Sequence, residues 1–286
     1  VLSRYDDVLA AAAYSATFSS HRGGGRPDGG TLIEDLPSDY AAGVLLNMMD
    51  DPRHQQIRKL CLPSVSAATL RRLADDLRAR TERIVDDALE AGDVDFLREV
   101  AAELPLQSVA ALLGVPQEDR HRLFGWANAT LDYDDRDLGE MSDASVTAAA
   151  EMYEYGQALI AAKEAEPGDD LLSALIVSDL PVRGDELQMF FSLLLAAGSE
   201  TTRNSIAVGA HALADRGDLW AELEADRSIL PGATEEILRW ASSTTYNRRT
   251  ATVDTEIGGV PIAAGDKVTL WWGSANYDER AFPDPY

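Results

Sequence analysis

The chain has 286 residues, 45% of them hydrophobic, so it is long enough to bury a substantial core. Lys and Arg number 25 against 49 Asp and Glu, and the formal net charge is −24. This charge argues against binding to nucleic acid or anionic membrane, because both favour cationic proteins. No apolar stretch reaches bilayer length and no basic-then-apolar leader opens the sequence. The single Cys excludes an internal disulfide and is typical of a reducing compartment, so we expect a cytoplasmic protein.

Helical periodicity and end signals predict a mainly α-helical chain with a small β region. We expect helices at residues 5–14, 66–91, 94–113, 117–131, 142–165, 168–177, 184–215 and 232–241. The Gly-rich stretch 19–31 is interpreted as a flexible loop, because no Lys-Ser/Thr pair follows it to make a phosphate loop. After residue 241 the pattern changes, with a hairpin at 255–262 and a further strand at 268–271.

The helix predicted at 184–215 contains a polar interruption. Apolar residues almost encircle it up to Ala197, which is typical of a helix buried on all sides. Gly198 then gives up roughly 1 kcal/mol of helix stability relative to Ala, and Glu200 and Thr201 are costly inside a core unless they are used. We expect a helix opened at this point, with a spare backbone carbonyl and a route for protons.

Two donors share one face of a helix that we expect to begin near Pro52. His54 and Arg58 lie four residues apart, so together they can bind a carboxylate or phosphate; a solvated polar face is the alternative. Cys61 follows on the same face. Two ligands do not complete a structural zinc site, and Cys is commonly a small buried residue, so metal binding by Cys61 is not expected.

Further charged residues occur towards the C-terminal end. Glu236 and Arg239 lie three apart on a predicted helix, where they form either an exposed pair of little value or a buried clamp. Arg249 stands at the entry to the strand region and faces either an anion or water.

The order of these motifs resembles a bacterial cytochrome P-450. The resemblance rests on the following segments: Asp51-Pro52-x-His54-x-x-x-Arg58, Ala197-Gly198-Ser199-Glu200-Thr201-Thr202, Glu236-x-x-Arg239, Arg249-x-Ala251, and Asn276-x-Asp278 before Phe282-Pro283-Asp284-Pro285. It covers essentially the whole chain and implies the cytochrome P-450 fold, a single domain over 1–286 with a long central helix over haem b.

The resemblance also implies roles for individual residues. Glu200 and Thr201 match the acid–alcohol pair that delivers protons to dioxygen, and Ala197 and Gly198 match the haem pocket beside it. The groups that hold the haem propionates match His54, Arg58 and Arg249. A structural role falls to the matched ion pair Glu236–Arg239, which we expect to be buried.

One part of the family pattern is not found in this chain. The family's haem ligand is a Cys thiolate in a Gly-rich loop, which would follow residue 286. Cys61 does not replace it, because it lies on the early helix. We therefore expect an internal stretch of a longer active enzyme, with no metal ligand of its own.

The scaffold resembles the actinobacterial group that oxidises sterol side chains and methyl-branched lipids, partly through Tyr133-Asp134-Asp135 and Thr201-Thr202-Arg203-Asn204. Substrate-pocket candidates are residues 35–50, Leu193, Leu194, Ala197, and the polar run Ser243-Thr244-Thr245-Tyr246-Asn247. An aliphatic substrate would leave that run unpaired. This favours an amino acid, peptide or other functionalised metabolite of secondary metabolism, free or bound to a carrier protein, although the run can also bond to itself or to water.

Three functions remain open at this stage. The first is a haem-thiolate monooxygenase that receives electrons from NAD(P)H through a ferredoxin reductase and a ferredoxin. The second is a haem-free relative that acts as a binding or scaffold protein. The third is an all-helical regulator in which the helix at 184–215 serves only packing.

Overall fold

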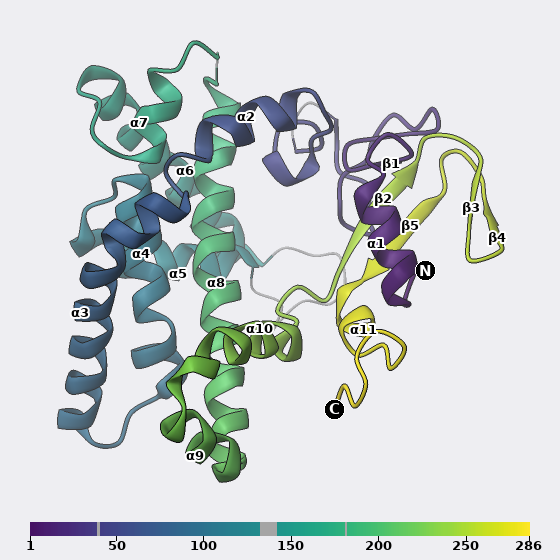
Figure 1. The fold of residues 1–286 in the computed structure, drawn as a ribbon. Helices are drawn as coiled ribbons and strands as arrows, with labels where there is room; N and C mark the ends of the chain where they lie inside the picture. The colour runs from purple at the N-terminus through teal and green to yellow at the C-terminus, as the bar shows by residue number, and fades with distance from the viewer. Residues whose placement is uncertain (39–40, 132–141, 181) are drawn as a thin grey trace. The chain divides into compact units, whose positions relative to one another are not determined.

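The strands form two small sheets, both drawn in Figure 1. The structure is a computed structural model that describes residues 1–38, 41–131, 142–180 and 182–286. One sheet is antiparallel and has the strand order β1-β2-β5, with β1 at Phe18–Ser19, β2 at Tyr246–Ala251 and β5 at Lys267–Trp271. β3 (Thr255–Ile257) and β4 (Val260–Ile262) form the predicted hairpin. Its two turn residues, Gly258 and Gly259, have φ angles of 60° and 79°, which side chains disfavour.

The chain divides into two compact units. One comprises Val1–His54 with Asn204–Tyr286, and the other comprises Gln55–Arg203. The first unit holds both sheets together with α1 (Tyr5–Ala13), α9 (Gly217–Ala225), α10 (Leu230–Ala241) and α11 (Trp272–Asn276), and the single-turn 3₁₀ helices Leu46–Met48 and Arg227–Ile229. Its core packs α1 against the sheet through apolar residues that include Val8, Phe18 and Leu270.

The second unit is entirely helical over the residues described. It holds α3 (Ala67–Ala91), a π-helical turn at Phe96–Ala101, α4 (Glu103–Leu113), a 3₁₀ turn at Gln117–Asp119, α5 (Arg120–Leu131), α6 (Asp143–Ala165) and α7 (Leu171–Ile176). Two further helices, α2 (Arg53–Cys61) and α8 (Asp185–Asp215), begin in one unit and end in the other. The mainly helical prediction with a small β region is confirmed.

Local chemistry explains where several helices begin and end. The Ser66 hydroxyl caps α3 by accepting the Thr69 N–H at 3.2 Å, and Gly92 ends it with a φ of 84°. The expected helix at 94–113 is instead split. A π-helical bond runs from the Ala102 N–H to the Leu97 carbonyl at 3.0 Å, and α4 then begins just before Pro105, which has no N–H to donate.

Two short helices were not predicted, and part of one prediction lies outside the described residues. α9 buries no side chain and its Trp220 is exposed, so it has no apolar stripe to detect. α11 has five residues, too few to show helical periodicity. Tyr133-Asp134-Asp135 and residues 39–40 of the pocket candidate 35–50 are not described by the structure. Among the residues that are described, no helix combines the length and apolar character needed to cross a bilayer.

Candidate active site

The site residues predicted on α8 lie along a face that the protein leaves partly open. On the opposite face Phe191, Leu195 and Ser199 recur at every fourth position and are almost completely buried. The partly open face carries the half-buried residues Leu193, Leu194, Glu200 and Thr201 and the exposed Ala197. The helix is therefore buried on one side rather than all round, and its open side bears the residues predicted there to contact oxygen or substrate, apart from Gly198.

The expected opening of this helix at Gly198 is wrong. α8 is an uninterrupted α-helix from Asp185 to Asp215. Close packing explains Gly198 instead, because a Cβ at this position would lie 3.0 Å from Cγ2 of Val109 on α4, and that side chain would have to shift. Gly198 thus marks a close contact between α8 and α4.

Both residues of the predicted acid–alcohol pair have polar neighbours within their own unit. The Thr201 hydroxyl donates to the Ala197 carbonyl at 2.8 Å, so this carbonyl is not spare but is shared with the side chain. The Glu200 carboxylate lies 3.7 Å from the guanidinium of Arg203, whose other contacts include Asn128 at 3.3 Å and the ring of Phe124. The ion pair with Arg203, which lies about one turn further along α8, therefore restrains the side chain of Glu200.

The predicted donors at the start of α2 share one helix. His54 Nδ1 lies 3.4 Å from Asp51 and the side chain is half-buried. Arg58 is exposed and forms no hydrogen bond or ion pair with any described residue. Cys61 ends the helix; burial raises the pKa of its thiol to about 11, with Arg58 opposing the shift. A thiol with this pKa is protonated at neutral pH, which does not favour metal binding.

Arg249 lies on β2 beside a very different arginine. Its guanidinium is half-buried, burial lowers its pKa, and the charge of Asp50 opposes the shift. No described residue pairs with it. The preceding Arg248, which alternation along the strand turns to the other face, is fully buried. It donates to the Leu32 carbonyl at 2.7 Å and to Asp35 at 3.0 Å.

These donors fit the propionates of a haem. Placing a guanidinium in a half-buried position without a partner is costly, and an anion supplied by a ligand removes that cost. The half-buried Arg249 carries this cost, and the exposed Arg58 also has donors that no described residue uses, whereas Arg248 has already used most of its donors inside the protein. The donor chemistry thus matches a ligand that brings its own carboxylates.

The predicted ion pair of α10 is present as a two-point fork. Arg239 donates to Glu236 at 2.8 and 2.6 Å and also to the carbonyls of Asn276 and Pro285. Its guanidinium lies 5.2 Å from the centre of the Tyr277 ring. The Arg239 side chain is 10% exposed but that of Glu236 is 60% exposed, so only the arginine of the pair is largely covered. Arg239 ties α10 to the C-terminal segment.

The polar run 243–247 is partly satisfied within its own unit. Ser243 hydrogen-bonds Ser205 of α8 at 2.9 Å, and Asn247 accepts the Trp272 indole N–H at 2.8 Å. Tyr246 stacks on Trp271, with the ring centres 5.2 Å apart. Thr244 and Thr245 are exposed, and their hydroxyls bond to no described residue. Self-pairing therefore accounts for the ends of the run but not for its two threonines.

Sequence analysis missed a cluster of charges around Asp35. Its carboxylate accepts hydrogen bonds from Arg26, Arg248 and Lys267, and these bonds hold its pKa below the ordinary value in spite of desolvation. The four residues span the loop at 20–38 and both strands of the β2–β5 pair. No periodic pattern links residues so far apart, so the sequence carried no signal for this cluster.

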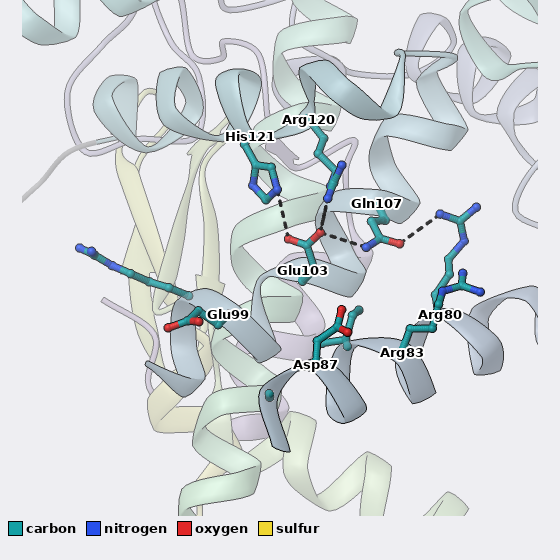
Figure 2. Close-up of a pocket in the computed structure, with 11 residues that line it drawn as sticks. Arg80, Arg83, Asp87, Glu99, Glu103, Gln107, Arg120 and His121 are labelled. Carbon is teal, nitrogen blue, oxygen red and sulfur yellow. Dashed lines mark hydrogen bonds and ion pairs between the residues drawn. The ribbon is translucent and has the colours of Figure 1, made fainter. Parts of the chain in front are cut away.

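A polar pocket of about 380 Å³ in the second unit contains none of the predicted residues. Figure 2 shows its Glu103 carboxylate held by Arg120 at 2.8 Å and Gln107 at 2.9 Å, with His121 at 3.6 Å and Arg80 on the far side of Gln107. These bonds lower the pKa of Glu103 against the opposing effect of burial. The cluster joins α3, α4 and α5 and has a structural role.

Comparison with known proteins assigns the family. The family model for cytochrome P450 matches residues 123–286, more than half of the chain. The chain is 44% identical to cytochrome P450 126 of Mycobacterium tuberculosis over 98% of its own length and 69% of that protein's. It therefore belongs to the cytochrome P450 family of oxidoreductases, the monooxygenase class that the sequence motifs predicted.

Two further relatives extend this result. A steroid C26-monooxygenase of Mycobacterium tuberculosis is 36% identical over the whole chain, which spans 65% of that protein. Cytochrome P450 CYP268A2 of Mycobacterium marinum, solved in complex with pseudoionone, superposes with a TM-score of 0.90 at 33% identity, covering 99% of this chain and 69% of that one. The predicted fold and the actinobacterial resemblance are confirmed.

Proposed function

We propose that the protein is a haem-dependent monooxygenase that inserts one oxygen atom of O₂ into a C–H bond of a small organic substrate. The second oxygen atom leaves as water after the supply of two electrons and two protons. NAD(P)H supplies the electrons through a ferredoxin reductase and a ferredoxin in the cytoplasm. The observation that carries the proposal is the partly open face of α8, on which Glu200 and Thr201 stand one turn beyond Ala197 and two turns beyond Leu193 and Leu194.

Haem b would be held by the two available guanidinium groups and one imidazole. Arg249 and Arg58, together with His54, would bind the propionates, because charge-assisted hydrogen bonds suit these anions. Bound haem would supply the activation of dioxygen. Ala197 has a small, exposed side chain, which leaves room for a flat ligand beside the helix at the turn that also contains Gly198.

Thr201 and Glu200 would move protons to the reacting oxygen. The Thr201 hydroxyl holds its proton against the Ala197 carbonyl at 2.8 Å, a bond that can be exchanged without unfolding the helix. Glu200 is half-buried and restrained by Arg203 at 3.7 Å, so its carboxylate can accept and return a proton at one place. A carboxylate and a hydroxyl on consecutive residues of the partly open face can thus form a relay from solvent.

The substrate would have a largely apolar body and at least one oxygen or nitrogen function. Leu193 and Leu194 offer apolar surface, while the hydroxyls of Thr244, Thr245 and Tyr246 make no bond to a described residue and favour a polar group. The steroid-oxidising relative at 36% identity supports the same kind of molecule. A steroid or branched lipid with a keto or hydroxyl group meets both requirements, whether free or carrier-bound.

Two measurements test this function. A haem absorption titration of the complete protein should show tighter binding of a ketosteroid than of a carrier-bound amino acid; the opposite order would contradict the substrate class. The Thr201→Ala variant should consume O₂ and NAD(P)H while forming much less product per O₂, because a positioned acid–base group is lost. Unchanged coupling would remove Thr201 from the relay.

A further inference from the structure

Asp50 joins three elements of the first unit. Its carboxylate accepts hydrogen bonds from the Ser19 hydroxyl and from the Ser20 N–H, the latter at 2.7 Å. Its carbonyl accepts the His54 N–H at 3.2 Å, in the turn that leads into α2. A single half-buried residue therefore fixes the start of α2 against strand β1.

The same carboxylate lies near Arg249. β1 pairs with β2 so that Ser19 stands opposite Thr250, the residue after Arg249. Burial lowers the pKa of Arg249, and the negative charge of Asp50 opposes part of that shift. The two side chains nevertheless form no ion pair within 4 Å, so the donors of Arg249 remain available. Asp50 thus acts on Arg249 through its charge without forming an ion pair with it.

We propose that Asp50 is a positioning residue for the haem propionates: it sets His54 relative to Arg249 and places a fixed negative charge beside the anion that Arg249 binds. This inference rests on the proposed function. A fixed negative charge disfavours the uptake of an electron nearby, and it competes with a propionate for the same guanidinium. Asp50 would therefore lower the reduction potential of the haem and weaken the binding of the propionate to Arg249.

The Asp50→Asn variant separates charge from anchoring. Asn keeps an oxygen for the Ser20 N–H and an amide that can donate to the Ser19 hydroxyl, but it carries no charge. In the haem-loaded complete protein, we expect a more positive midpoint potential and haem transfer to apomyoglobin slowed roughly three-fold, as for a partly screened charge. Ser19→Ala loosens the anchor and keeps the charge, so it should speed haem transfer and leave the potential unchanged.

Glu256→Gln is the matched control, because Glu256 is an exposed carboxylate on β3 of the same unit. If Asp50→Asn retains haem and matches this control in both potential and transfer rate, Asp50 has only a structural role and the inference fails. If the complete protein takes up no haem under any condition, the proposed function fails and the inference falls with it. Transfer rates are measured below the melting range of each variant, so that unfolding does not contribute.

Discussion

Two neighbouring arginines of strand β2 lie on opposite faces of the strand and differ in their partners. On one face Arg248 is fully buried and spends its donors on Leu32, Asp35 and Thr250. On the other face Arg249 is half-buried and pairs with no described residue. Both have pKa values lowered by burial, so burial alone does not distinguish them. What distinguishes them is whether the protein supplies the anion: Asp35 pairs with Arg248, whereas no described residue pairs with Arg249, which supports its proposed role in ligand binding.

We expect the largest effect on stability when the fully buried Arg248 is replaced. Arg248→Met removes a fully buried cation and leaves Asp35 with fewer partners, so the free energy of unfolding should fall by about 3 kcal/mol or more. Denaturant titration measures this. A loss below about 1 kcal/mol would show that the buried network contributes no more than a surface ion pair.

Replacement of Arg249 should change haem affinity rather than stability. Arg249→Leu removes an unpaired half-buried cation, so the apoprotein should keep its stability while haem affinity falls by about 2 kcal/mol, the size of a lost charge-assisted hydrogen bond. Haem titration and denaturant titration of the same variant provide the two readouts. Loss of stability without loss of haem affinity would reverse the roles of the two arginines.

The Glu103 cluster supplies a smaller test from the other unit. The pKa of Glu103 is below its ordinary value of 4.5, so its ion pair stabilises the fold above that pH and loses its contribution as the pH falls through the lowered pKa. Glu103→Gln should cost about 1 kcal/mol at neutral pH and progressively less in acid, because protonated Glu is also uncharged. Haem binding should not change. A cost that stays constant with pH would mean that the charge of Glu103 is not what stabilises the cluster.

The sequence predicted most of the helices because their apolar periodicity and end caps are local signals. The order of short motifs along the chain also indicated the family, while the roles of the individual site residues stay predictions. The sequence could not predict that Arg248 is structural and Arg249 unpaired, since the difference depends on Asp35, more than 200 positions away. The same limit explains Gly198: its sequence neighbours suggested an open helix, while the reason for the Gly is Val109 on another helix.

The exposure of Glu236 shows a related limit. Spacing on α10 indicated that Glu236 and Arg239 can meet, and the structure joins them at 2.6 and 2.8 Å. Burial depends on what else covers the helix, and only Arg239 is covered, by the C-terminal segment that holds Asn276 and Pro285. Helical spacing gives the pair; tertiary packing decides how much it contributes.

The most direct test is the absorption spectrum of the complete protein, reduced and exposed to carbon monoxide, measured together with its haem content. The unpaired Arg249 on β2 and the partly open face of α8, each taken by itself, predict stoichiometric haem and the carbon monoxide band of a thiolate-bound iron, with both diminished in Arg249→Leu. A protein that binds no haem, or one fully loaded with haem that lacks this band, would contradict the assignment of the unpaired arginine and the open helix face to a haem monooxygenase.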